Sequence, residues 1–153
     1  MAKPSTLCSI AIMNVSSKIL ILCLQLLVLI SCNVKNTSNI KVKGIIIDNA
    51  NGQPIENANV TVLCWYDAGW DKTDYVSHDT VTDSNGSYEL TFEEGYKVIV
   101  ASVAPEYQRT LHEINNLKND EVMVNLELKK DSTQTNLSET KLEDYILSNT
   151  SSL

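Results

Sequence analysis

Between residues 40 and 129 the chain repeats one pattern, in which short runs rich in β-branched residues are separated by turn-forming residues every 8 to 15 positions. The clearest run alternates Val122, Val124, Leu126 and Leu128 with polar neighbours, as expected of a strand with one buried face. About seven such strands, with few competing helical segments, favour two packed sheets in an all-β sandwich. The predicted strands are residues 40–47, 58–66, 76–82, 87–92, 96–104, 107–114 and 121–129.

The second predicted strand places four small or apolar side chains on one face. Ala58, Val60, Val62 and Cys64 alternate with other residues and are expected to point into the core. Cys64 is also the one cysteine that follows residue 32, so the domain has no internal disulfide partner and must be stabilised by its apolar core. A thiol inside such a run is expected to be buried and inert.

Three turn motifs resemble one known family. The segments are residues 44–48 (GIIID), 52–60 (GQPIENANV) and 82–88 (TDSNGSY), and together they look like a carboxypeptidase regulatory-like domain over residues 40–130. The resemblance implies a seven-stranded, transthyretin-like or prealbumin-like Greek-key sandwich. Asn57 stands where that family often has Gly, and residues 105–107 replace its usual Gly-Tyr, which affects the local turns. The resemblance implies no catalytic residues, and such domains serve as folding, spacing or binding modules.

The first 32 residues have the features of an export signal. Lys3 and Lys18 supply positive charge, no acidic residue occurs, and residues 19–30 are apolar apart from Gln25. This run is shorter than the roughly 20 apolar residues of a membrane-spanning helix. The ending Leu-Ile-Ser-Cys at Cys32 resembles the lipobox of bacterial lipoproteins, in which the cysteine is acylated and becomes the first residue after cleavage. A plain signal peptide or an uncleaved anchor is the alternative.

This interpretation divides the chain into four parts. Residues 1–31 are predicted to form a signal peptide with a helical core, and residues 32–39 a lipid-carrying polar spacer. Residues 40–130 form the sandwich, and residues 131–153 a flexible polar tail. Several acyl chains on Cys32 would hold the domain on a membrane of the bacterial cell envelope, with the outer membrane as the expected one.

The predicted tail contains one short amphipathic segment. Residues 139–147 place Leu142, Tyr145 and Ile146 at helical spacing. A helix of this length does not persist alone in water. The sequence favours a mobile tail, with docking of the helix on the sandwich as the alternative.

The charge balance excludes one class of partner. Beyond residue 31 the chain keeps 10 basic and 19 acidic residues, a net charge of −9. A nucleic-acid-binding face needs clustered Lys and Arg, so no nucleic-acid partner is expected.

Candidate catalytic and metal-binding groups are few. Transthyretin-like sandwiches include hydroxyisourate hydrolase, but Arg109 and His112 are spaced for opposite faces of a strand. His78, Asp79 and Asp83 lack zinc-ligand spacing, and the turn beginning at Asp83 lacks the later Glu of a calcium loop. We therefore predict no enzyme activity, no cofactor and no metal.

The most distinctive surface feature is residues 65–75, where four aromatic residues crowd a polar connection. Flat rings beside carboxylates suit a protein partner or the faces of a sugar. For these rings we favour the interpretation that Trp65 plugs the end of the sandwich and Trp70 packs over a sheet edge, with a binding surface as the other interpretation. We predict a binding or spacing module for an envelope protein partner, with glycan binding by this aromatic segment as the alternative. The candidate contact residues are Trp65, Tyr66, Trp70 and Tyr75.

Overall fold

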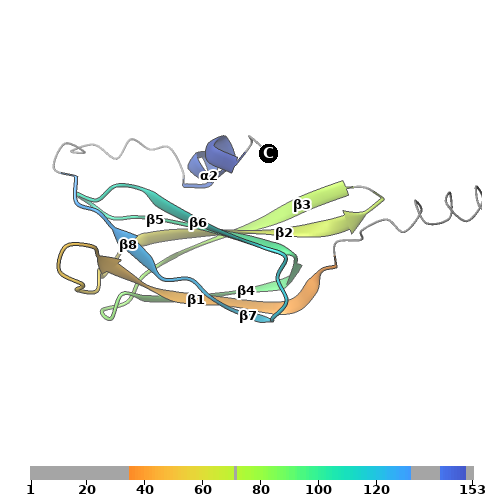
Figure 1. Ribbon diagram of the computed structural model, residues 1–153, viewed down its shortest axis with the longest axis horizontal. Helices are drawn as coiled ribbons and strands as arrows, with labels where there is room; N and C mark the ends of the chain where they lie inside the picture. Colours follow the sequence, from red (N-terminus) through yellow and green to blue (C-terminus); the bar gives the residue numbers. More distant parts are fainter. Residues whose placement is uncertain (1–34, 71, 132–141, 151–153) are drawn as a thin grey trace, which may run out of the picture. The chain divides into compact units, whose positions relative to one another are not determined.

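Two four-stranded β-sheets face each other in the computed structural model, which describes residues 35–70, 72–131 and 142–150 (Figure 1). One sheet has the order β4-β1-β7, with β8 also paired to β1, and the other has the order β3-β2-β5-β6. The predicted all-β, two-sheet architecture is therefore confirmed. The elements are β1 (Thr37–Asp48), β2 (Asn59–Gly69), β3 (Lys72–Val81), β4 (Ser87–Gly95), β5 (Lys97–Val103), β6 (Thr110–Asn115), β7 (Glu121–Met123), β8 (Leu126–Leu128) and α2 (Leu142–Thr150).

The core lies between the sheets and follows the alternation of the strands. Ala58, Val60, Val62 and Cys64 are all fully buried there, as their spacing predicts. Burial raises the pKa of the Cys64 thiol to about 12, which agrees with an inert core cysteine. The opposing sheet contributes side chains from β1, β4, β7 and β8 to the same cluster, among them Ile40, Val42, Ile46, Tyr88, Phe92, Val122 and Leu126.

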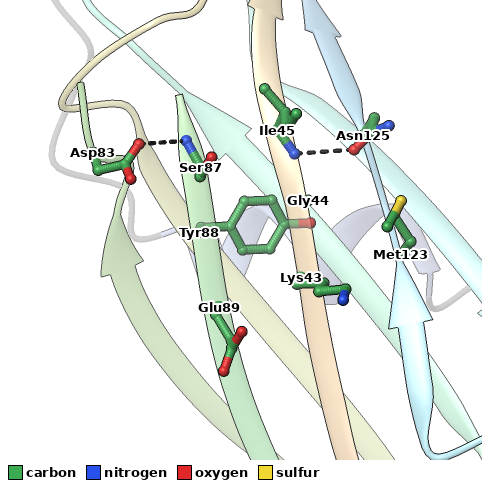
Figure 2. Close-up of a pocket in the computed structure, with 9 residues that line it drawn as sticks. All are labelled: Lys43, Gly44, Ile45, Asp83, Ser87, Tyr88, Glu89, Met123 and Asn125. Atoms are coloured by element: carbon green, nitrogen blue, oxygen red, sulfur yellow. Dashed lines mark hydrogen bonds between the residues drawn. The ribbon is translucent and has the colours of Figure 1, made fainter. Parts of the chain in front are cut away.

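The last predicted strand is interrupted, so that β7 and β8 each pair in parallel with β1. Gly44 lies at the interruption, and a Cβ built there would come within 1.7 Å of the Val124 carbonyl oxygen. The Asn125 side chain takes the place of a strand backbone by accepting a hydrogen bond from Ile45 N at 3.0 Å (Figure 2). The Tyr88 hydroxyl donates to Val124 O at 2.7 Å and fixes the same point. Alternation alone did not reveal this break, because the apolar residues keep their period across it.

Helix α2 covers the outer face of the second sheet. Leu142 and Ile146, four residues apart and hence on one side of the helix, pack against a second apolar cluster that contains Leu63 and Ile99. The alternative of docking therefore holds for residues 142–150. The other residues of the predicted tail, 132–141 and 151–153, lie outside the described residues.

Candidate functional site

The β2–β3 hairpin is longer than its sheet. Strand β2 pairs with β5 only as far as Trp65, so residues 66–69 and their partners in β3 extend past the neighbouring strands (Figure 1). The segment predicted as a polar connection is therefore mostly strand. Its turn contains two residues with positive φ, Gly69 at 80° and Trp70 at 51°. Trp70 at this tip is 98% exposed and does not pack over a sheet edge.

Strand alternation separates the other three aromatic residues onto two faces. Trp65 and Tyr75 are directly opposite each other, with ring centroids 5.0 Å apart, and both pack into the cluster under α2. The Tyr75 hydroxyl donates to Glu143 Oε1 at 3.1 Å, and this hydrogen bond raises the pKa of Tyr75. Tyr66 belongs to the other face. The four candidate contact residues thus do not form one aromatic platform.

Tyr66 contributes to a groove between the edges of the two sheets, where β3 and β4 lie. We call it the β3–β4 groove; its volume is about 890 Å³. His78 from β3 stacks on Phe92 from β4 at 4.8 Å between ring centroids and 19° between planes, and both rings line the groove. The groove is lined by Asn39, Lys41, Tyr66, Val76, His78, Thr91, Phe92, Glu93 and Glu94.

The charge of this region is mostly negative. Glu93 and Glu94 come from β4, and Asp74 and Asp79 from β3, all on exposed positions. Lys41 lies in the groove, but its ammonium is already 3.3 Å from Glu89. The groove therefore combines aromatic and aliphatic surface with an excess of carboxylates.

A second hollow, of about 340 Å³, lies on the outer side of the first sheet near Gly44 (Figure 2). Its polar groups are engaged within the protein. Lys43 is ion-paired with Glu121, and Asp83 Oδ1 accepts hydrogen bonds from Asn85 N and Ser87 N, both at 2.8 Å. Few groups are left to orient a ligand, so this hollow is the weaker candidate.

The remaining candidates from the sequence do not converge. Asp79 accepts a hydrogen bond from the Thr61 hydroxyl, while Asp83 serves its own turn. The Arg109 guanidinium lies 5.5 Å from the Tyr145 ring centroid, and His112 is exposed on β6. Among residues 35–70, 72–131 and 142–150, no group of three His, Cys, Asp or Glu side chains could hold a metal ion.

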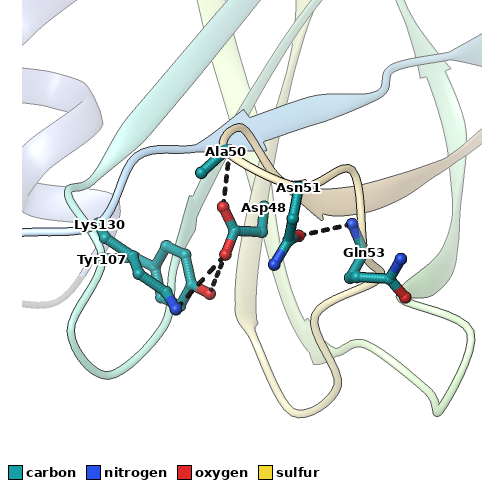
Figure 3. A network of polar contacts seen from close by, with 6 residues as sticks. All are labelled: Asp48, Ala50, Asn51, Gln53, Tyr107 and Lys130. Carbon is teal, nitrogen blue, oxygen red and sulfur yellow. Dashed lines mark hydrogen bonds and ion pairs between the residues drawn. The ribbon is translucent and has the colours of Figure 1, made fainter.

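Sequence reasoning missed a buried carboxylate at the end of β1. Asp48 is only 3% exposed, and its oxygens accept hydrogen bonds from Ala50 N at 2.7 Å and from the Tyr107 hydroxyl at 2.9 Å (Figure 3). The Lys130 ammonium lies 3.6 Å away. The bond from Ala50 N contributes most to lowering the pKa of Asp48, with Tyr107 and Lys130 adding to it. The signal in the sequence is the turn after Asp48, where an Asp commonly bonds the amide two residues on.

Asp48→Asn is expected to make the free energy of unfolding depend less on pH in the acid range. The folded-state pKa lies below the ordinary value of 3.8, so folding favours the ionised carboxylate. The resulting stabilisation is present above that ordinary value and is lost as the pH falls through the lowered folded-state pKa. Melting temperatures measured on acidification should therefore fall more steeply for the wild type than for the variant. Asp120→Asn, which removes an exposed carboxylate next to β7, is the control; equal slopes for wild type and Asp48→Asn would contradict the assignment.

Cys32 and the predicted signal lie outside the described residues. Within the described ranges, no helix has the length and hydropathy needed to cross a bilayer.

Comparisons with known proteins find likeness at the level of structure. No protein-family model and no curated protein matches the chain. Catechol 1,2-dioxygenase from Acinetobacter radioresistens superposes on 68% of this chain with a TM-score of 0.47 and 16% identity. Hydroxyquinol 1,2-dioxygenase from Pseudomonas putida DLL-E4 covers 64% of this chain with a TM-score of 0.48 and 8% identity. The Bacillus anthracis TIE protein covers 61% with a TM-score of 0.47 and 18% identity.

The likeness covers a limited part of each neighbour. The match spans 56% of the catechol dioxygenase chain, 58% of the hydroxyquinol dioxygenase chain and 18% of the TIE protein. With identities of 8% to 18% and TM-scores below 0.49 in these three cases, the neighbours give no argument about the chemistry of this chain.

The prediction of no enzyme activity is corrected by this comparison. Enzyme activity was not expected because Arg109 and His112 are spaced for opposite faces of a strand, whereas the similar solved structures include dioxygenases. The prediction that the chain is not an enzyme is therefore not kept. The comparison assigns no reaction to the chain in its place.

Proposed function

We propose that this chain is a lipid-anchored protein of the bacterial cell envelope, whose β-sandwich binds or spaces a protein partner. The basic start, the apolar run and the lipobox-like ending at Cys32 support the anchor. The residues between Cys32 and β1 would separate the sandwich from the membrane; this spacer is shorter than the predicted 32–39, because residues 37–39 belong to β1, where Thr37 pairs with Gly95. The outer membrane is the proposed location.

We also propose that the sandwich is a carboxypeptidase regulatory-like domain with a transthyretin-like Greek-key arrangement. Its family-like turns support this assignment, because Pro54 bridges to Ile47 just after β1 and residues 83–86 close the connection from β3 to β4. The chain also moves repeatedly between sheets, with β4 returning beside β1 and β5 beside β2. The resemblance then implies the seven-stranded version, in which β7 and β8 count as one interrupted strand.

The observation that carries the binding proposal is the side chain of Trp70. A tryptophan that is 98% exposed at the end of a projecting hairpin leaves a large apolar ring in water. Exposed tryptophans are enriched among the residues that dominate the energy of protein interfaces. The adjacent β3–β4 groove supplies further aromatic surface through Tyr66.

The test is site-specific photo-cross-linking in intact cells. A photo-reactive phenylalanine at position 70 is expected to give a discrete cross-linked species at a yield several-fold above that from position 85. Asn85 is a matched control, because it is also exposed in a turn but lies at the opposite end of β3. Equal yields at the two positions would contradict binding through the hairpin tip.

The anchor is tested separately. Cys32→Ser is expected to abolish incorporation of labelled palmitate and to release the protein from the membrane fraction. A variant that stays in the membrane fraction, with no label in the wild type, would count against the lipid anchor.

Glycan binding is the alternative, because a solvent-exposed indole also stacks on sugar faces. Affinity electrophoresis through gels containing polysaccharide separates the two proposals. Retardation that disappears in Trp70→Ala would favour the glycan, whereas unchanged mobility would favour the protein partner.

A further inference from the structure

Strand β3 is an open edge of the second sheet. It pairs with β2 on one side, and none of the described strands pairs with it on the other. Ten residues long and free of proline, it lacks devices that commonly protect an edge, such as shortness, a proline or a bulge between Asp74 and Val81. Such an edge is a template for the addition of another strand.

The hydrogen-bond alternation identifies the groups that face outward. Thr82 N donates to Ala58 O at 3.0 Å, which sets the pairing phase of the hairpin. In an antiparallel pair, successive residues direct their amide and carbonyl groups alternately toward and away from the partner strand. Tyr75, Ser77 and Asp79 therefore direct theirs to the open side, over a stretch long enough for an added strand of about five residues. The Tyr75 amide already donates to Asp74 Oδ1 at 2.8 Å, so the amides of Ser77 and Asp79 are the donors offered to an added strand.

The β3–β4 groove lies on the inner side of this edge. Val76 and His78 point into it from β3, and Phe92 together with Glu93 lines it from β4. An added strand would project alternate side chains into the groove. Val76 is 41% exposed in the unbound chain, so such side chains would cover apolar surface that now meets water.

We propose that β3 binds an extended segment of the partner protein as an added strand, and that this segment alternates apolar or aromatic residues with Lys or Arg. The groove and the edge carry four carboxylates against two lysines, Lys41 and Lys72, and Lys41 is ion-paired with Glu89. This excess selects a basic segment. The net charge of −9 beyond residue 31 disfavours a second copy of the same chain as the occupant. The inference rests on the proposed binding function and defines the class of partner.

The experiment uses a phage-displayed library of random 12-residue peptides, selected on the detergent-solubilised full-length chain. The selected peptides are expected to alternate β-branched or aromatic residues with Lys or Arg. Their affinity should fall at least tenfold on Ser77→Pro, because proline removes the outward amide at a position where an edge strand tolerates it. Ser77→Ala keeps the amide and is the matched control, with unchanged affinity expected.

A second variant guards against loss of folding in Ser77→Pro. Glu93→Lys changes an exposed charge in the groove and is expected to weaken the same peptides several-fold at low salt, with the difference shrinking as salt is added. Selected peptides that are acidic, or that bind the wild type, Ser77→Pro and Glu93→Lys equally, would overturn strand addition.

Failure of this inference is distinguishable from failure of the proposed function. Cross-linking from position 70 that persists while no peptide depends on Ser77 or Glu93 leaves the binding function in place and removes strand addition. Peptides that depend on both residues, without cross-linking from position 70, support the edge and count against the hairpin tip.

Discussion

Gly44→Ala is expected to lower the free energy of unfolding by about 3 kcal/mol, the upper end of the usual cost of overpacking. The added methyl group would lie 1.7 Å from the Val124 carbonyl oxygen and 3.0 Å from Tyr88 Cε1. The closest obstacle is backbone, so no rotamer change relieves it. Separation of β1 from Val124 would also strain the hydrogen bond from Val124 N to Lys43 O, now 2.8 Å.

Chemical denaturation followed by circular dichroism measures this effect. Gly52→Ala is the matched control, because Gly52 has a φ of 70° but no atom within 4 Å of a built Cβ. It should cost about 1 kcal/mol from backbone strain alone. Similar losses for the two variants would contradict the close approach of Val124 as the reason for glycine at position 44.

Ile146→Ala is expected to remove much of the packing that holds α2 on the sheet. Ile146 is fully buried against the cluster of Leu63 and Ile99, and truncating such a side chain typically costs about 2 kcal/mol or more. A nine-residue helix has little stability of its own, so the loss should appear as undocking followed by fraying. The uncovered apolar face should increase the fluorescence of a hydrophobic dye.

Hydrogen exchange distinguishes undocking from global unfolding. Amides of α2 should exchange much faster in Ile146→Ala, while amides of β1 and β4 should change little. Asn149→Ala, on the exposed side of the same helix, is the control. It should leave the exchange rates unchanged, both for the amides of α2 and for the amides of β1 and β4. Faster exchange throughout the chain would indicate that α2 and the two sheets unfold as one unit.

Alternation in the sequence was sufficient to place the central part of most strands, because burial of one face imposes a period of two. Ile40, Val42 and Ile46 of β1 follow that rule closely, with more exposed residues between them. The same rule, applied to residues 65–75, would have separated Trp65 from Tyr66. Those residues were instead interpreted as one loop surface, since their Asp and Gly content resembles a connection.

Other features depend on groups that are distant in sequence and were not predictable from local pattern. Asp48 is stabilised partly by Tyr107 and Lys130, which reach it from segments more than fifty residues away. Docking of α2 depends on Leu63 and Ile99, which pack in the cluster on the helix side of the sheet. In the sequence, these two residues do not differ from the other apolar residues of their strands. The indole N–H of Trp65, buried without an acceptor among the described residues, also has no counterpart in the sequence pattern.

Strands β2 and β5 are covered on both sides, by the core and by α2. Residues 60–64 are buried without exception, and so are residues 98–103. In saturation mutagenesis, every position in these two stretches should therefore tolerate polar substitutions poorly. Along β1, by contrast, tolerance should alternate from one residue to the next. Homologues that lack the terminal helix should carry Thr, Lys or Glu at the positions of Leu63 and Ile99, since water would then wet that side.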